Sequence, residues 1–330
     1  MEALARTLLQ GKYYNLTREY DLGDELSAGN FSKVYKITSK TGEKKDFAVK
    51  ILKKKLYQDE KRKYLKDMFR VSHTNVVDHI TTVSDDKYLF SVMELVTGGT
   101  LFDQLLKNRT FTEKSVVNIV KQVLDGCRYL HSYGIVHSDL TPKNILFKNA
   151  SENSTVLICG FGLKFIRDRV HDIVSLHGYR DVAFASPEIA LRNPYNNRAD
   201  IWSLGVITYV VLSGDLPFCS DDQAKLIEMI RDEDVKFDST SWQVISSNAK
   251  NFISNSLIKD PLRRPKAVIV MKHDWIVENF SVPLPNREKL KQSVTTLRKQ
   301  RKLNTHTVAE KFKALSMASK LMSIEEEEEP

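Results

Sequence analysis

The stretch HSDLTPKNIL, residues 137–146, decides the fold, because its neighbours give it a setting that chance rarely produces. The preceding residues 113–134 place apolar side chains at the spacing of a long amphipathic helix. The following residues 145–158 carry strand signals. Further on, residues 198–214 and 246–260 again predict long helices, the first of them buried. The stretch therefore belongs to a large, mainly helical lobe.

The chain before the glycine pair at 98–99 has a different character. Residues 20–50 hold β-branched and aromatic residues around a turn, which predicts short strands. Residues 58–70 lack Gly and Pro and predict a helix, and residues 87–96 predict another strand. The expected α+β organisation is an N-terminal extension (1–19), a small β-rich lobe (about 20–95), a larger helical lobe (about 96–280) and a helical C-terminal tail (281–330).

Two features of the small lobe suit a nucleotide. Residues 26–34 (LSAGNFSKV) lie between two strands, and the backbone N–H groups of such a hairpin can fold over a polyphosphate. Lys50 follows at the end of an apolar strand, where an ammonium is costly to bury without an anionic partner. A surface lysine is the alternative interpretation of Lys50 taken alone.

Taken together, these motifs resemble a protein kinase over residues 20–280, in order and in spacing. The segments VTGGTLFD (96–103) and GIVH (134–137) are most similar to the calcium/calmodulin-dependent Ser/Thr branch. The resemblance implies a bilobal protein-kinase-like fold. It also implies that Arg264 pairs with Glu188 and that Asp200 braces the catalytic loop.

By the same resemblance, the site would bind ATP. Lys50 would reach the α- and β-phosphates, Asp139 would orient a substrate hydroxyl and accept its proton, and Asn144 would help to hold a metal ion. Met93 would be the gatekeeper. The remaining positions expected around the nucleotide are the hinge from Glu94 to Val96 and the wall residues Leu26, Gly29, Val34, Ala48 and Leu146.

The departures from the family pattern concentrate on the phosphate and metal side. Gly160 stands where the family has the Asp of Asp-Phe-Gly, whose carboxylate carries the metal that bridges the β- and γ-phosphates. The other departures are Ser27 for the first loop glycine, Ser138 for the Arg before Asp139, Thr141 for the catalytic-loop Lys, Thr100 for the ribose Glu, and Tyr64 for the Glu that pairs with Lys50. Either Glu60 or Asp67, one turn to each side of Tyr64, could restore that ion pair.

Each lost electrostatic contact would cost on the order of 10²–10³ in rate. The pattern therefore favours a pseudokinase that binds ATP with weak or absent Mg²⁺ and acts as a regulated scaffold. Because Lys50, Asp139 and Asn144 are retained, an active or weakly active Ser/Thr protein kinase is the first alternative. A scaffold without nucleotide is the second.

The tail carries a concentrated basic segment. Residues 287–303 hold seven Lys/Arg against one Glu, with apolar residues on one face of a predicted helix. This pattern is typical of a calmodulin target, and its position after a domain of the calmodulin-dependent type favours calmodulin as partner. The anchors would be Leu290, Val294, Leu297 and Leu303. Any basic amphipathic helix gives similar spacing, and residues 308–321 repeat it.

Composition excludes several other classes. The 330 residues are 42% hydrophobic and 28% charged, as in ordinary globular proteins. The net charge of +8 does not indicate nucleic acid, because aromatic residues are not interleaved with the basic run. No apolar run is long enough for a membrane span. Cys127, Cys159 and Cys219 lie in apolar surroundings without CxxC spacing, which predicts reduced, buried thiols in a cytoplasmic protein, with a nuclear location as the alternative.

Overall fold

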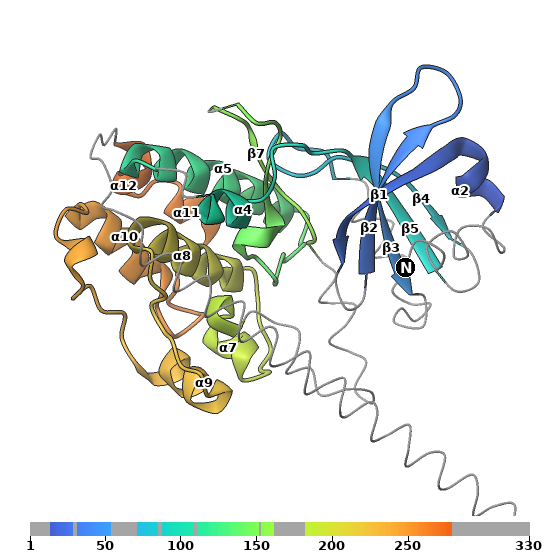
Figure 1. Cartoon of the computed structure of the whole chain (residues 1–330). Coiled ribbons are helices and arrows are strands. Elements are labelled where there is room, and N and C mark those ends of the chain that lie inside the picture. Colours follow the sequence, from blue (N-terminus) through green and yellow to red (C-terminus); the bar gives the residue numbers. More distant parts are fainter. Residues whose placement is uncertain are drawn as a thin grey trace, which may run out of the picture.

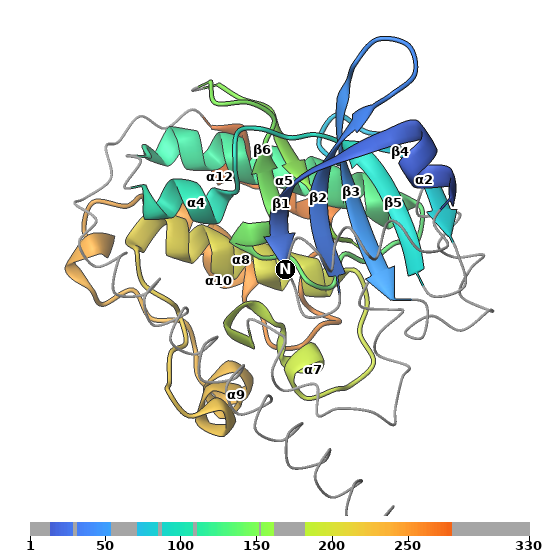
Figure 2. The ribbon, with the colours of Figure 1, turned by 45° about the vertical axis from the view of Figure 1, so that its right-hand side comes forward.

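The computed structural model describes residues 14–28, 32–53, 71–84, 88–107, 111–151, 153–161 and 182–278. Strands β1 to β5 form one sheet, and helices α4 to α12 form a larger lobe beside it (Figures 1 and 2). The predicted two-lobed α+β architecture is therefore confirmed. The helix expected at 58–70 and the tail at 281–330 lie outside the described residues.

The small lobe is built on an antiparallel sheet with the strand order β1-β2-β3-β5-β4. Its strands are β1 (Tyr20–Ala28), β2 (Ser32–Ser39), β3 (Asp46–Lys53), β4 (His79–Ser84) and β5 (Tyr88–Glu94). Ile37 and Val49 share one buried face, because successive side chains of a strand point to opposite faces. Helix α2 (Tyr14–Glu19) packs against this face through Leu16, which is only 3% exposed. The sequence did not predict this helix, since six residues with one buried leucine carry no periodicity.

The larger lobe is mainly helical. Its elements are α4 (Leu101–Leu106), α5 (Glu113–Ser132), η3 (Pro142–Asn144), β6 (Ile145–Phe147), β7 (Val156–Ile158), η5 (Val182–Phe184), α7 (Pro187–Ala190), α8 (Arg198–Ser213), α9 (Gln223–Asp232), η6 (Thr240–Trp242), α10 (Ser247–Ser256), α11 (Ala267–Val270) and α12 (Asp274–Val277). The elements labelled η are single 3-10 turns. Helix α8 is buried from Ala199 to Ser213 and packs against α5 and α10, as a helix that is apolar on all sides must. It ends at Gly214, whose φ of +82° lies in the left-handed region that favours glycine.

A buried carboxylate ties three of these helices together. Glu113, the first residue of α5, is fully buried. It accepts hydrogen bonds from the backbone N–H and the hydroxyl of Ser246, which caps α10, and from Nε1 of Trp275 in α12 at 2.8 Å. The positive end of the α5 dipole favours the negative charge at this place.

The loop from 71 to 78 joins the lobes. The side chain of Asn75 donates to the backbone oxygen of Val156 at 2.8 Å, and the backbone carbonyl of Asn75 accepts from the N–H of Ile158 at 2.9 Å. On α5, a Cβ at Gly126 would lie 2.7 Å from that same carbonyl oxygen. Glycine is therefore required for this close approach.

The thiol prediction holds in part. Cys127 is buried and Cys159 is half-buried, but Cys219 is exposed, so the prediction was wrong for Cys219. The reason is local: Phe218, only 1% exposed, takes the inward position of this segment and turns its neighbour to solvent. In the described part of the chain, no helix has the length and apolar character needed to cross a bilayer.

Candidate functional site

The loop 137–144 is anchored on the first turn of α8. The carboxylate of Asp200 accepts hydrogen bonds from the backbone N–H groups of His137 at 2.9 Å and Ser138 at 2.7 Å, and from Nε2 of His131 at 2.7 Å. Burial raises the pKa of Asp200, but the contacts from His131 and Ser138 outweigh it and hold that pKa below its ordinary value. These contacts also hold Ser138 at a φ of +62°, a conformation that few residues other than glycine adopt. The predicted bracing contact is present.

His137 joins this loop to residues 159–161. Its Nε2 lies 2.9 Å from the carbonyl oxygen of Cys159, and because a carbonyl only accepts, Nε2 carries the proton. The other ring nitrogen accepts from the backbone N–H of Asp139 at 3.3 Å. Burial lowers the pKa of His137, in agreement with a neutral ring. The ring of Phe161 stands edge-on to it at 6.5 Å.

The structure brings Asp139 and Asn144 together. The side-chain amide of Asn144 donates to the backbone oxygen of Asp139 at 2.7 Å. The backbone oxygen of Asn144 accepts from the N–H of Cys159 at 2.9 Å. The side chain of Asp139 is half-buried. This frame leaves the amide oxygen of Asn144 beside residue 160.

Gly160 adopts a φ of +80°, and a Cβ placed on it would lie 3.3 Å from the side-chain oxygen of Asn144. A carboxylate at position 160 would therefore stand next to Asn144, where glycine supplies no ligand. Across the described residues, no group of three or more His, Cys, Asp or Glu side chains could hold a metal ion. One neutral amide oxygen does not fit a phosphate-bridging Mg²⁺, which is normally held through carboxylates.

Lys50 lies in the middle of the small sheet. It pairs with Val34 on β2 and with Ser91 on β5, while its neighbour Ala48 pairs with Met93. Strand alternation places Lys50, Ala48 and Val34 on the sheet face opposite to the one that α2 covers.

The charge of Lys50 acts on the thiol of Cys159. Burial raises the pKa of Cys159 to about 11, and the charge of Lys50 opposes that rise. The charge of Lys50 therefore reaches the residue that precedes Gly160. Of the other predicted wall residues, Leu146 is half-buried and Leu26 is 49% exposed.

The hinge is held by its own contacts. Glu94 donates its N–H to the carbonyl of Asp78 at 3.0 Å and accepts from the N–H of Asp78 at 2.9 Å, so its side chain is structural. Val96 is half-buried. At Gly98, a Cβ would overlap the carbonyl oxygens of Phe147 and Asn149, so the chain after the hinge needs glycine there.

Three hydroxyls stand where the family pattern has charged groups, and none supplies a charge to the site. Thr100 caps α4: its hydroxyl donates to the carboxylate of Asp103 at 2.7 Å and accepts from the N–H of Asp103 at 3.0 Å. Thr141 is buried. The hydroxyl of Ser138 is buried without a hydrogen-bond partner.

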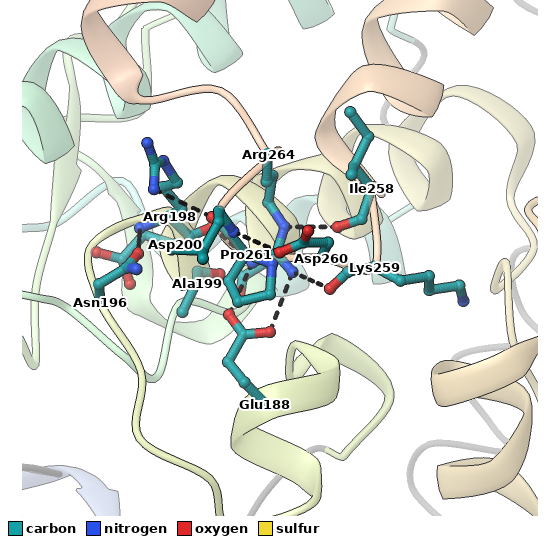
Figure 3. A network of polar contacts seen from close by, with 12 residues as sticks. Glu188, Asn196, Arg198, Ala199, Asp200, Ile258, Lys259, Asp260, Pro261 and Arg264 are labelled. Atoms are coloured by element: carbon teal, nitrogen blue, oxygen red, sulfur yellow. Dashed lines mark hydrogen bonds and ion pairs between the residues drawn. The ribbon is translucent and has the colours of Figure 1, made fainter.

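Figure 3 shows the predicted pair of Arg264 and Glu188, which is present and buried. All five guanidinium donors are used: Nη1 and Nη2 bind Glu188 at 2.8 and 3.0 Å, and the others reach the carbonyls of Ile258, Arg198 and Lys259. The pair braces α7 against the segment before α11 and contacts none of the residues expected around a nucleotide. Gly29, Tyr64, Glu60, Asp67 and the four tail anchors Leu290, Val294, Leu297 and Leu303 lie outside the described residues.

Sequence reasoning missed two supporting groups. His131 holds Asp200 from the end of α5, and its signal was a polar residue after Leu130 on an otherwise buried helix face. Glu25 on β1 accepts from both Lys33 and Tyr35 on β2. The only sequence signal for that cluster was the two-residue spacing of Lys33 and Tyr35, which puts them on one strand face.

Comparisons with known proteins bear on the family of the chain. The family described as "Protein kinase domain" matches residues 20–276. The chain is 34% identical over 268 residues to "Calcium/calmodulin-dependent protein kinase type 1" of Caenorhabditis briggsae, covering 80% of this chain and 74% of that protein. It is 33% identical over 264 residues to "Serine/threonine-protein kinase H1" of Homo sapiens, covering 79% of this chain and 62% of that protein.

Proposed function

Because the chain belongs to the protein kinase family, we propose that it binds ATP at this site but is impaired in phosphoryl transfer, and that it acts as a regulated scaffold. The observation that carries the proposal is Gly160 beside Asn144. Phosphoryl transfer depends on positioning and on neutralising the charge that develops on the phosphates. With no carboxylate at position 160, that charge lacks its metal counterion.

Nucleotide binding rests on the retained face of the small lobe. Lys50 offers a cation to the phosphates, and Ala48, Val34 and Leu26 offer apolar contact to a base. These contacts need no metal. ATP would therefore bind with little dependence on Mg²⁺.

An active or weakly active Ser/Thr protein kinase is the second candidate. The observation that favours it is the intact frame around Asp139. His137 and Asn144 bind the backbone of Asp139 and so fix its position, as a proton acceptor requires. In that case Asp139 would accept the proton of a substrate hydroxyl.

Two measurements separate these functions. Thermal unfolding with ATP in EDTA and in Mg²⁺ tests binding: a hundredfold excess over the dissociation constant stabilises by about 2.7 kcal/mol. We expect a shift of similar size in both conditions, and no shift in either would support the scaffold without nucleotide. Transfer from ATP to a protein substrate is then compared for native protein and Asp139→Ala. If the native protein transfers phosphate robustly and Asp139→Ala abolishes this transfer, the proposal of an impaired enzyme is refuted.

We further propose that calmodulin binds the basic segment 287–303 and that the protein works in the cytoplasm. Support comes from the charge and spacing of that segment and from the similarity to the Caenorhabditis relative, a calcium/calmodulin-dependent protein kinase. The test is the affinity of a 285–305 peptide for calmodulin with and without Ca²⁺. A matched peptide with Leu290 and Leu297 changed to Asp should bind at least about tenfold more weakly. Equal affinities with and without Ca²⁺ would remove the proposal.

A further inference from the structure

A cluster of three side chains links β1 to β2 where the candidate nucleotide site begins. One oxygen of Glu25 accepts hydrogen bonds from Nζ of Lys33 at 2.8 Å and from the hydroxyl of Tyr35 at 2.9 Å. We call these three residues the hairpin clasp. The side chains of Glu25 and Lys33 keep 35% and 31% of their surface exposed, whereas Tyr35 is buried. The buried phenol therefore gives the carboxylate a fixed partner, and the ion pair with Lys33 is partly screened by solvent.

The backbone of β1 is irregular on both sides of Glu25. Between Leu22 and Glu25, and again between Glu25 and Ser27, β1 holds one residue more than the facing part of β2. Leu26 is the extra residue of the second bulge and has no cross-strand partner in the ladder. Bulges re-aim a side chain, and an unpaired residue takes its direction from its neighbours. The direction of Leu26 therefore depends on how firmly Glu25 is held.

The clasp lies on the far side of the hairpin from the candidate site. Tyr35 packs in the cluster that contains Leu16, and Glu25 is its direct cross-strand partner. Val34, the partner of Lys50, points to the opposite face. Glu25 is therefore placed to act on a ligand only through its neighbour Leu26, which is 49% exposed.

Resting on the proposed nucleotide binding, we propose that Glu25 is a positioning residue: the clasp holds β1 between its two bulges so that Leu26 packs against the base of a bound nucleotide. The contact between Leu26 and the base would contribute a larger share of the binding free energy in this chain than in a kinase with a metal ligand at position 160. Without a metal ligand at position 160, the phosphates contribute less to binding, and the base contributes a larger share of the total.

The test compares two clusters of matched chemistry in one sheet. The affinities for ATP and for adenosine are measured by calorimetry in EDTA for native protein, Glu25→Gln and Tyr35→Phe. We expect both dissociation constants to rise about fivefold to tenfold in each variant, because both ligands carry the base. The control is Asp46→Asn: Asp46 accepts from Lys36 and Thr38, both at 2.7 Å, at the opposite end of β2 from the loop. It should leave both affinities unchanged.

A double-mutant cycle tests the route through Leu26. In a Leu26→Ala background, Glu25→Gln should weaken ATP binding by less than about twofold, because the side chain it positions is gone. Native affinity in both clasp variants, or an undiminished effect of Glu25→Gln without Leu26, would overturn the inference while leaving nucleotide binding standing. A native protein that binds neither ligand would overturn both proposals. Tyr35→Phe keeps the buried ring, so the test survives if Glu25→Gln fails to fold.

Discussion

Restoring a carboxylate at position 160 tests the site most directly. In Gly160→Asp the new side chain starts 3.3 Å from the amide oxygen of Asn144, a contact that a small rotation of that amide relieves. The φ of +80° costs an L-residue about 1–2 kcal/mol, less for Asp than for most, and reduced freedom of the unfolded chain offsets about 0.4–1 kcal/mol. The net loss of about 1 kcal/mol should lower the unfolding temperature by about 2–4 °C.

The expected gain in ATP binding and in phosphoryl transfer is much larger than this loss of stability. A carboxylate beside Asn144 completes a pair of oxygen ligands for Mg²⁺, so ATP binding should become tighter in Mg²⁺ than in EDTA. If the missing ligand is the main defect, transfer should rise by on the order of 10²–10³, the cost typical of one lost electrostatic contact. The assays are calorimetry with ATP in both conditions and transfer of labelled γ-phosphate to a protein substrate.

The matched control is Gly160→Asn, which tolerates the same backbone conformation but carries no charge. It should reproduce the loss of stability without the dependence on Mg²⁺. The reasoning fails if the folded Gly160→Asp protein binds ATP equally in Mg²⁺ and EDTA, or if Gly160→Asn shows the same gain.

Three further predictions concern the lobes. Glu188→Gln leaves the fully buried Arg264 without its counterion and should lower the free energy of unfolding by about 3–5 kcal/mol, as urea denaturation measures. Replacing both residues by Met should lower it by less, and an equal loss in the two variants would contradict this reasoning. Burial lowers the pKa of His79 to about 4 from an ordinary 6.5, so its contribution to stability is complete above pH 6.5 and declines as the pH falls toward 4. Urea midpoints should fall over that range and fall less in His79→Gln; parallel curves would refute the assignment. A thiol reagent at pH 8 should label the exposed Cys219 within seconds to minutes. It should label the buried Cys127 only on unfolding, because burial raises the pKa of that thiol well above its ordinary value. Peptide mapping would report which of the two cysteines is labelled.

The long-range braces were predictable from sequence and the local geometry was not. The resemblance to the kinase family placed Asp200 under the loop 137–144 and Arg264 on Glu188, and both contacts are present. They are stable because each of these buried charged side chains needs a partner that satisfies it. Helix α2 escaped prediction, since the position of Leu16 is set by a sheet face that forms from later residues. Cys219 was wrongly placed inside, because an apolar neighbourhood in sequence does not say which of two adjacent side chains turns inward.

The hairpin clasp illustrates the same limit at the site. Counted from the loop, Tyr35 lies opposite Glu25 only because β1 carries the extra residue Leu26 between Glu25 and Ser27. In a regular hairpin of the same sequence the register would differ, and neighbouring side chains would exchange faces. No residue in the stretch marks this bulge unambiguously, so a contact that depends on it is visible only in the structure.

In the family pattern, position 160 supplies both a left-handed backbone conformation and a carboxylate that carries the metal, and Gly160 keeps only the first. Its backbone lies in the left-handed region, where a carboxylate-bearing residue is strained and glycine is not. The contacts that hold the surrounding frame run through backbone groups of Cys159 and Asn144 and through Asp200, and none of them uses a side chain at position 160. Glycine at position 160 therefore leaves this frame intact and removes only the carboxylate that this position would supply. An aspartate at this position would carry about 1–2 kcal/mol of backbone strain that glycine avoids, which agrees with the proposal that the site binds nucleotide without a metal.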